Sequence, residues 1–414
     1  MAQEGVRRRK ICMVTYVPDP ADLPPLLNKA RSLVRCGHEV LVLCHTDRPD
    51  LPHRERYDGG LDIVRIYSRT RRFFKKAYGL SPRSTFVAFI QYVVTYAEYN
   101  LRVLGCALRA GADLYEAHDL PTLPATLVAS RIRRRPILYQ AHELHAETHR
   151  HVRFAAFWRF LERSLVPLVD TVLTPEENRS RIMKEEAGAQ GWPLTVMNCP
   201  PYRPPLRTDR LRKALRERGL RARFIVLYQG LFDDDRCIKE LIASAQHFAD
   251  GIVLVLMGSG YGAYADLAPL ITDPARVAVL PRVHYDQILE YTASADAGVL
   301  LYRNTCRNNY FCAPNKIHEY MMMGLPVVAN DYPGMKKLVD GERVGFAIDG
   351  EDPRLIADAV NRLADPAGPH REFRENALRA ARDRYNWEQQ FARLEAEYLR
   401  LLGGAASSEA PPPR

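Results

Sequence analysis

The feature that most constrains the fold is a regular alternation of short apolar segments with longer amphipathic ones along the chain. In the first half, strand-like runs at 11–16 and 39–44 flank a segment at 23–36 with helical spacing, which stops at Gly37. This order predicts a strand–helix–strand unit. Further strand-like runs lie at 63–67, 113–117, 136–139 and 171–174. Strands that alternate with helices favour a mainly parallel, doubly wound α/β sheet.

A proline-rich segment divides the chain. Four of the eight residues from Cys199 to Leu206 are proline, which suits neither a helix interior nor a central strand. The alternation then resumes with strand-like runs at 224–228, 252–257, 277–280, 298–301 and 326–329 and a last helix at 387–402. We therefore expect a first domain at 1–199, a linker at 200–206, a second domain at 207–385, a C-terminal helix at 386–402 that packs back on the core, and a disordered tail at 403–414.

Composition excludes several classes of protein. With 414 residues, 47% of them hydrophobic and 26% charged, the chain is typical of globular proteins with two or three domains. Its longest apolar stretch, at 86–97, falls short of the ~20 residues that a membrane-spanning helix needs. The N-terminus has no leader-like apolar segment, and the eight cysteines lack the spacing of zinc or redox motifs. We therefore expect a cytoplasmic protein with reduced thiols.

The positive charge is concentrated in the first half. Residues 1–198 hold 30 Lys and Arg against 21 Asp and Glu, while the whole chain has a net charge of +10. A positive electrostatic field of this kind favours binding of an anionic partner, but the same charge can equally keep the protein soluble. One segment, 65–76, mixes basic and aromatic residues, which suits either an anionic membrane surface or a solvated loop. Its members are Arg65, Tyr67, Arg69, Arg71, Arg72, Phe73, Phe74, Lys75 and Lys76.

Polar residues follow several of the predicted strands, where ligands bind in open α/β sheets. In the first half these residues are His118 and Asp119, then His142 and Glu143. In the second half they are Gln229, Gly230, Gly258 and Arg282.

The segment from Pro314 to Gly324 predicts a helix with an anion site at its start. Proline suits the first helical position and glycine the position just past the end. A helix N-terminus offers unpaired N–H groups to a diphosphate. Asn315 and Glu319 share one face, so the Glu319 carboxylate is placed to accept hydrogen bonds from ribose hydroxyls. A capped surface helix with a solvated Glu319 explains the same pattern.

The same helix carries a resemblance to a known family. Pro314, Asn315 and Lys316, with Glu319, Tyr320 and 324–328, resemble the signature of glycosyltransferase family 4. Similar likenesses occur at 228–230 with Arg236, at 257–260, at 296–299, at 116–119 and at 141–144. The resemblance implies the α/β GT-B fold, in which two Rossmann-like domains with doubly wound parallel sheets face an interdomain cleft. It also implies retaining transfer from a nucleotide sugar, as in bacterial surface-polysaccharide or glycoconjugate transferases.

The resemblance assigns roles to residues. Glu319 is implied to bind the ribose, Arg236 and the amides of the Pro314 helix to hold the diphosphate, and His118 to contact the donor sugar near the scissile bond. His118 and Arg236 are thus the expected catalytic residues. Expected donor-binding residues are Gly230, Lys239, Gly258, Arg282, Val283, Asn315, Lys316 and Glu319. His142 and Glu143 are expected on the acceptor side.

Two departures from the family pattern leave alternatives open. Many relatives have an acidic residue where this chain has Phe311, and a basic one where it has Leu231. Lys239 or Lys316 is a possible substitute for the missing cation. A catalytically weak GT-B-like binding subunit and a nucleotide-sugar epimerase therefore stay as alternatives to the transferase.

Two other site types are disfavoured. His145 and His149 have helical spacing, yet the segment is not an HExxH motif, so we expect no metal and favour a polar acceptor rim. Gly258, Gly260 and Gly262 lack the third glycine of the dinucleotide fingerprint, and a tight turn after a strand explains them. We expect no cofactor. The expected partners are a nucleoside-diphosphate sugar, a sugar, lipid-linked or small-molecule acceptor, and an anionic membrane surface at 65–76 on the cytoplasmic side, but no nucleic acid.

Overall fold

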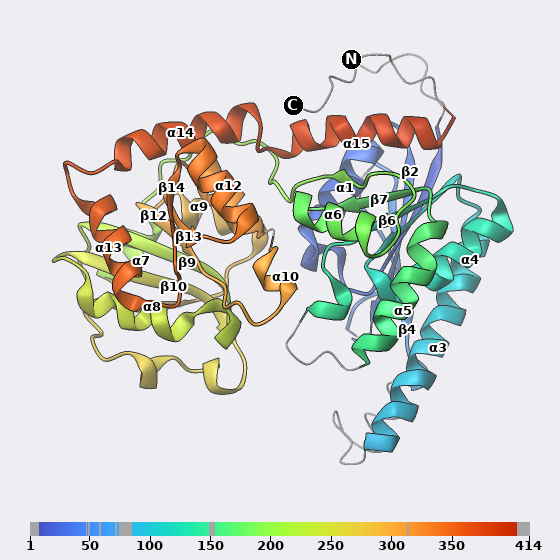
Figure 1. Ribbon diagram of the computed structural model, residues 1–414, viewed down its shortest axis with the longest axis horizontal. Helices are drawn as coiled ribbons and strands as arrows, with labels where there is room; N and C mark the ends of the chain where they lie inside the picture. The colour runs from blue at the N-terminus through green and yellow to red at the C-terminus, as the bar shows by residue number, and fades with distance from the viewer. Residues whose placement is uncertain are drawn as a thin grey trace. The chain divides into compact units, whose positions relative to one another are not determined.

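The computed structural model describes residues 8–46, 48, 50–57, 59–70, 73, 85–148, 154–312 and 314–403 (Figure 1). The chain forms two compact units. Unit 1 comprises Met1–Ala146, Val152–Val196 and Phe391–Arg414, and unit 2 comprises Glu147–His151 and Met197–Gln390. The division at 196/197 lies just before the proline-rich segment.

Unit 1 is built on an eight-stranded sheet in the order β3-β4-β2-β1-β5-β6-β7-β8. Every neighbouring pair is parallel except β3 with β4. The strands are β1 (Lys10–Thr15), β2 (Glu39–Thr46), β3 (Arg54–Tyr57), β4 (Leu61–Tyr67), β5 (Leu114–His118), β6 (Ile137–Gln140), β7 (Thr171–Thr174) and β8 (Leu194–Thr195). The chain therefore winds outward in both directions from β1, and the order reverses between β1 and β5.

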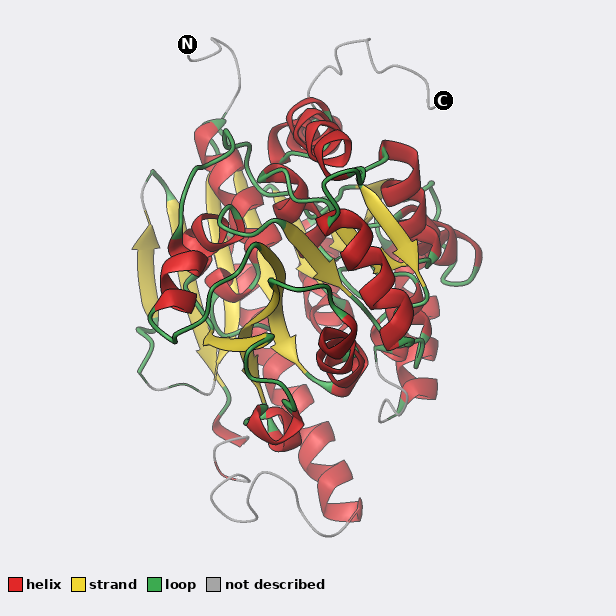
Figure 2. Ribbon diagram, turned by 90° about the vertical axis from the view of Figure 1, so that its left-hand side faces the viewer, coloured by secondary structure: helices red, strands yellow, loops and turns green. Residues whose placement is uncertain are grey.

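The helices of unit 1 connect these strands. They are α1 (Pro24–Arg35), α3 (Thr85–Ala110), α4 (Leu123–Arg133), α5 (Ala155–Leu165) and α6 (Glu177–Glu185). Figures 1 and 2 both show that the N-terminal half of α3 projects beyond the sheet of its unit. The apolar stretch at 86–97 lies within this helix. Among the described residues, no helix combines the length and the apolar character needed to cross a membrane.

Unit 2 is built on a six-stranded parallel sheet in the order β11-β10-β9-β12-β13-β14. Its strands are β9 (Phe224–Phe232), β10 (Ile252–Gly260), β11 (Val277–Pro281), β12 (Ala297–Leu300), β13 (Val327–Asn330) and β14 (Gly345–Ile348). Its helices are α7 (Arg210–Arg216), α8 (Ile238–Ser244), α9 (Ile288–Thr292), α10 (Arg307–Tyr310), α11 (Asn315–Met322), α12 (Pro333–Glu342), α13 (Pro353–Ala364) and α14 (His370–Asp383). The order reverses between β9 and β12, which makes their carboxyl ends the expected ligand site.

The central strands of unit 2 are buried on both faces, which explains their nearly continuous apolar sequence. Along β9, Ile225 and Leu227 join a core cluster with Tyr320 of α11, whereas Val226 joins a second cluster with Leu241 of α8. In Figure 2 helices, drawn red, lie against the strands, drawn yellow. The prediction of doubly wound α/β architecture is confirmed.

The last helix, α15 (Trp387–Leu401), begins in unit 2, and its residues from Phe391 belong to unit 1. Leu394 and Tyr398, four residues apart on one face, are both buried. Residues 404–414 of the expected tail lie outside the described part of the chain.

The glycines of the second half have a different role from the one expected. β9 and β10 continue through Phe232 and Gly260, so Gly230 and Gly258 are paired inside the sheet and do not lie in a turn. A Cβ on Gly258 would lie 1.8 Å from the carbonyl oxygen of Gly230. The turn interpretation is wrong for Gly258 and Gly260, which lie inside β10 where two strands approach closely, whereas Gly262 follows the strand with a φ of +58°.

Candidate functional site

In unit 2, helix α11 begins beside the carboxyl end of β9. Pro314 is the residue before the helix and makes no side-chain cap, and Asn315 is the first helical residue. The phenol of Tyr320 ties the helix to the sheet: its oxygen donates to the Leu227 carbonyl at 3.2 Å and accepts from the Gln229 amide at 3.3 Å. A Cβ on Gly298 would lie 2.4 Å from the Tyr320 ring, so glycine is required there. The sheet thus fixes the start of α11.

Glu319 is a buried carboxylate with one amide partner. Its residue exposure is 5%, and Nε2 of Gln229 donates to its Oε2 at 2.6 Å. Burial raises the pKa of Glu319 to about 7, against the smaller opposing effect of the Gln229 hydrogen bond. Oε1 of Gln229 accepts from Thr292 at 2.9 Å, which fixes which end of the amide faces Glu319. The orienting role of Gln229 was not predicted.

Two cations lie near each other at the start of α11, each over an aromatic ring, and one of them, Lys316, interacts with Glu319. The Arg236 guanidinium is 4.3 Å from the centre of the Tyr302 ring, and the Lys316 ammonium is 4.4 Å from that of Tyr228. Lys316 also donates to the Tyr228 hydroxyl at 3.3 Å. The rings come from β9 and from the segment after β12, the two strands at which the order reverses. Such contacts hold a cation without neutralising it.

The electrostatics of this cluster favour an anion. Burial, and then the nearby charge of Arg236, lower the pKa of Lys316 to about 7. Neither cation has an ion pair with a carboxylate among the residues that the structure describes. Oδ1 of Asp233 is buried without a hydrogen-bond partner, and burial raises the pKa of this acid despite Arg236. Repulsion between two cations is relieved when a diphosphate binds both.

Gly230 gives Lys316 its place. Its φ is +134°, and a Cβ there would lie 2.7 Å from the Lys316 ammonium. Any larger residue at 230 would therefore displace the cation from the ring of Tyr228.

In unit 1, a buried charged network lies where β5 and β6 end. The ammonium of Lys29 on α1 contacts Oε1 of Glu116 and donates to Oε1 of Gln140 at 2.8 Å. The hydroxyl of Tyr398 on α15 donates to the other oxygen of Glu116. Burial raises the pKa of Glu116, but Lys29 and His118 beside it outweigh this and hold it below its ordinary value. The roles of Lys29 and Tyr398 in this network were not predicted from the sequence.

Two histidines continue this network. Nε2 of His118 lies 3.2 Å from Oε1 of Glu116, and its Nδ1 lies 2.9 Å from Nε2 of His142. The two rings stack with centres 5.2 Å apart. Burial lowers the pKa of both rings, so both are neutral near pH 7. Both ring nitrogens of His118 therefore face groups inside unit 1, although the 3.2 Å contact of Nε2 with Glu116 does not have hydrogen-bond geometry, and the residue is 1% exposed.

Asp119 supports the outer histidine. Its Oδ1 accepts from the amides of His142 at 2.9 Å and Glu143 at 3.3 Å. Its φ of +65° is rare for a residue other than glycine, and such positions collect at functional sites. Burial, and then Glu143, raise the pKa of Asp119 to about 7. Glu143 itself is exposed.

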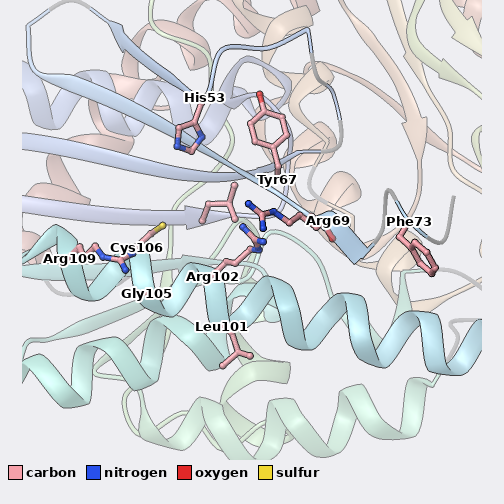
Figure 3. A pocket seen from close by; sticks show the side chains of 11 residues that line it. His53, Tyr67, Arg69, Phe73, Leu101, Arg102, Gly105, Cys106 and Arg109 are labelled. Carbon is pink, nitrogen blue, oxygen red and sulfur yellow. The ribbon is translucent and has the colours of Figure 1, made fainter. Parts of the chain in front are cut away.

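Unit 1 also contains a cavity of about 1110 Å³ between β4 and α3 (Figure 3). None of its lining residues belongs to β5 or β6, so it is separate from the histidines. Arg69 and Arg102 point toward each other in it, and Arg109 lies farther along α3. Phe73 and Leu101 add apolar surface at its edge.

Two family models match the chain. The model described as "Glycosyl transferases group 1" matches residues 223–365 of unit 2. The model described as "Glycosyl transferase 4-like domain" matches residues 26–200. The chain belongs to the family-4 type of glycosyltransferases.

Solved structures similar to this glycosyltransferase have the GT-B fold. Sucrose-phosphate synthase from Thermosynechococcus elongatus has a TM-score of 0.72 and 18% identity, with 96% of this chain and 100% of that chain covered. The Anabaena protein HepE in complex with UDP-glucose has a TM-score of 0.69 and 19% identity, with 95% and 100% covered. α,α-Trehalose 6-phosphate synthase from Burkholderia multivorans has a TM-score of 0.63 and 14% identity, with 99% and 100% covered. No curated protein matches the sequence.

Four of the predicted donor residues of the glycosyltransferase are brought together. Gly230, Arg236, Lys316 and Glu319 surround the start of α11, and Gly258 pairs with Gly230. Asn315 opens the helix and is half-buried. Their roles toward a donor stay predictions.

Other predicted residues lie apart from that cluster or outside the described chain. The exposed Lys239 lies 3.8 Å from Asp234, and no contact joins it to Arg236 or Lys316 among the described residues. Arg282 is exposed beyond edge strand β11, and Val283 packs against the core. No group of three or more His, Cys, Asp or Glu suited to a metal occurs in the described ranges. His149 and His151 lie outside them.

Proposed function

We propose that this glycosyltransferase takes its sugar from a nucleoside diphosphate bound by unit 2 and transfers it to an acceptor hydroxyl bound by unit 1. The observation that carries the donor assignment is the pairing of two cations with a buried carboxylate at the start of α11. Arg236 and Lys316 suit the diphosphate, and Glu319, held by Gln229, suits the ribose hydroxyls. The HepE structure, which contains UDP-glucose, supports a donor of this class.

The cluster also suits the chemistry of transfer. When the bond between the sugar C1 and the phosphate oxygen breaks, negative charge develops on the departing diphosphate. Arg236, Lys316 and the N–H groups of α11 are fixed donors for that charge, so they stabilise the transition state more than the ground state. We propose retention without a metal ion: the acceptor oxygen attacks C1 from the same face, and its proton passes to the leaving phosphate. No enzymic nucleophile is then needed.

We also propose that the protein works in polysaccharide or glycoconjugate synthesis at the cytoplasmic face of a membrane. All eight cysteines are free thiols, which suits a reducing compartment. The expected basic segment needs one correction. Arg65 is fully buried and pairs with Asp19 at 3.0 Å and Glu55 at 2.8 Å, so it is not available to a lipid. Arg71, Arg72, Phe74, Lys75 and Lys76 lie outside the described residues.

The described part of unit 1 offers another surface for a membrane, the α3–α5 face. Its exposed apolar residues are Phe89, Ile90, Val93, Val94 and Leu101 of α3, with Phe154, Phe157 and Phe160 at and within α5. Phe89 and Phe154 lie edge to face at 5.3 Å, which joins the two helices into one patch. Apolar patches of this kind on otherwise polar proteins mark interaction sites.

Charge on the α3–α5 face favours anionic lipid. Arg159 and Arg163 of α5 are exposed, and Arg69, Arg102 and Arg109 line the neighbouring cavity. The carboxylates of these two helices are not free to repel an anionic surface. Glu98 accepts hydrogen bonds from Ser68, Thr70 and Arg102, and Glu162 is only 9% exposed. Aromatic rings at headgroup depth with arginines on lipid phosphates are typical of proteins that bind membrane surfaces.

The donor assignment is tested with the variant Arg236→Ala. Calorimetry with UDP, GDP, ADP and dTDP identifies the base, and release of that nucleotide from its sugar donor measures turnover. We expect Arg236→Ala to lower turnover by about 100-fold or more, as loss of one such fixed donor does. The control is Arg354→Ala, which removes an exposed arginine from the start of α13 and should change nothing.

Two results count against the proposal. Absence of heat with every nucleotide removes the donor site, and normal turnover of Arg236→Ala removes its catalytic role. Product analysis separates the alternatives: an epimerase returns an altered nucleotide sugar, and a binding subunit binds the nucleotide without releasing any sugar.

A further inference from the structure

We infer that Glu116, His118 and His142 form a chain that fixes the tautomers of both imidazoles and presents Nδ1 of His142 as a hydrogen-bond acceptor for a substrate hydroxyl. Glu116 and His118 are positioning residues in this scheme, and His142 is the residue that touches the ligand. The choice of the acceptor hydroxyl as that ligand rests on the proposed function, but the tautomers do not.

The chain starts at a carboxylate that can only accept. Glu116 is fully buried, and Lys29 and the Tyr398 hydroxyl donate to its two oxygens. Lys29, whose side chain is 2% exposed, balances its charge. An ionised carboxylate has no proton to give, so the His118 Nε2 that faces it at 3.2 Å carries the hydrogen.

The tautomer of His118 then determines the tautomer of His142. A neutral imidazole with a proton on Nε2 has a lone pair on Nδ1. Because Nδ1 of His118 faces Nε2 of His142 at 2.9 Å, that nitrogen of His142 must donate. His142 in turn keeps a lone pair on Nδ1. This nitrogen has no hydrogen-bond partner among the described residues, and 8% of the His142 surface stays exposed.

The position of His142 is fixed from both sides. Oδ1 of Asp119 accepts from its amide, and the guanidinium of Arg179 on α6 donates to its carbonyl oxygen. The charged or titratable groups that face the two rings are Lys29 from α1, Glu116 and Asp119 at β5, Glu143 after β6, Arg179 from α6 and Tyr398 from α15. Burial opposes a positive charge on His118 and lowers its pKa although Glu116 favours the cation, and Lys29 adds to the opposition.

A competing arrangement makes the inference falsifiable. If His118 were an imidazolium paired with Glu116, both of its nitrogens would donate. Nε2 of His142 would then accept, and its Nδ1 would carry a proton and offer a donor in place of an acceptor. The competing arrangement holds one more proton: His118 carries a second proton on Nδ1, and the proton of His142 moves from Nε2 to Nδ1.

Nitrogen-15 spectra of the histidine rings in the full-length protein distinguish them. We expect both His118 and His142 to be neutral at pH 7, each with its proton on Nε2. In Glu116→Gln, the oxygen that accepts from Lys29 also faces His118, so the amide nitrogen faces Tyr398 and both tautomers should stay as in the wild type. A His118 held as a cation by the charge of Glu116 would instead lose its extra proton in this variant. The matched control is Glu162→Gln, another buried carboxylate of unit 1, which should leave both rings unchanged.

The wild-type spectrum alone is decisive if Glu116→Gln does not fold. A protonated His118, or a proton on Nδ1 of His142, overturns the inference. So does a change of tautomer in the Glu162→Gln control or in a folded Glu116→Gln.

The ligand assignment has a separate test. In His142→Ala, turnover of the nucleotide sugar identified by calorimetry should fall about 10-fold, the effect of one lost hydrogen bond to substrate, with an unchanged KM for that donor. Unchanged turnover overturns the assignment of the hydroxyl. A failure of nucleotide binding in the wild type refutes the proposed function and leaves the tautomer result standing.

Discussion

At Glu319, the demands of burial and of ligand binding oppose each other. The carboxylate is 5% exposed, and its one hydrogen-bond partner among the described residues is the side-chain amide of Gln229. Burial raises its pKa to about 7, so ionising it in the folded protein costs free energy. Ribose hydroxyls that donate to it would repay that cost only in the complex.

The first prediction at the residue scale concerns the pH dependence of stability in Glu319→Gln. The folded pKa of about 7 lies above the ordinary value of 4.5, so the wild type loses stability as pH rises from 4.5 through 7. Glutamine has no charge to bury. The variant should therefore exceed the wild type in free energy of unfolding by about 1–3 kcal/mol at pH 8 and match it near pH 4.5.

Urea unfolding of both proteins across that range measures the difference. A constant difference between pH 4.5 and pH 8 would mean that Glu319 is not the titrating group. Nucleotide affinity of the same variant should fall, because the ribose loses its charged acceptor.

Site residues were predictable where their role depends on neighbours in the sequence, and not where it depends on contacts with distant residues. Glu319 follows from the pattern of one helix, and Lys316 and Arg236 from the family resemblance. Gln229 is adjacent to a predicted glycine, but its role comes from a contact to Glu319, 90 residues away. The contact of Tyr398 with Glu116 spans 282 residues. No local pattern encodes such contacts, because they depend on how the finished sheet brings its edges and helices together.

At the scale of elements, the paired strands β9 and β10 depend on glycine in their interior. The sequence predicted both strands but ended them near Tyr228 and Met257, because glycine normally weakens a strand. The missed strands β3, β8 and β14 are short or lie at or next to a sheet edge, and their apolar pattern is correspondingly weak. Doubly wound topology itself followed from the alternation of element types.

Two glycine-to-alanine substitutions in unit 2 should have opposite effects. Gly258→Ala places a Cβ 1.8 Å from the Gly230 carbonyl oxygen, so backbone must move, and we expect a loss of about 3 kcal/mol or more. Gly341 lies in α12 with nothing within 4 Å of its would-be Cβ. Gly341→Ala should gain about 0.5–1 kcal/mol from helix propensity.

Thermal unfolding of the two variants against the wild type measures both effects. Equal stability of Gly258→Ala and Gly341→Ala would show that β9 and β10 do not approach as closely as the structure indicates.

At the scale of the whole molecule, the α3–α5 face of unit 1 gives the membrane proposal its test. Phe157 and Phe160 are 44% and 69% exposed. We expect the protein to float with vesicles of phosphatidylcholine and phosphatidylglycerol, but less with phosphatidylcholine alone. Phe157→Ser with Phe160→Ser should lower the bound fraction several-fold, because two rings no longer enter the headgroup layer.

Trp192→Ser is the matched control, since Trp192 is 65% exposed and lies outside both helices. Equal flotation with and without anionic lipid, or no effect of the double serine variant, contradicts a membrane role. Light scattering of the protein without lipid shows whether the apolar face joins two copies instead.

The contact between Tyr398 and Glu116 has a consequence for biosynthesis. A ribosome makes most of unit 1 before it makes unit 2, yet the phenol that completes the environment of Glu116 lies in the part of unit 1 that follows unit 2 in the sequence. Before Tyr398 is made, the Glu116 carboxylate lacks this hydroxyl donor and can contact only Lys29 and His118 of the partners described above. Unit 1 thus matures only after unit 2 has been synthesised, and a nascent or truncated chain that ends before Phe391 would lack the Tyr398 contact beside His118.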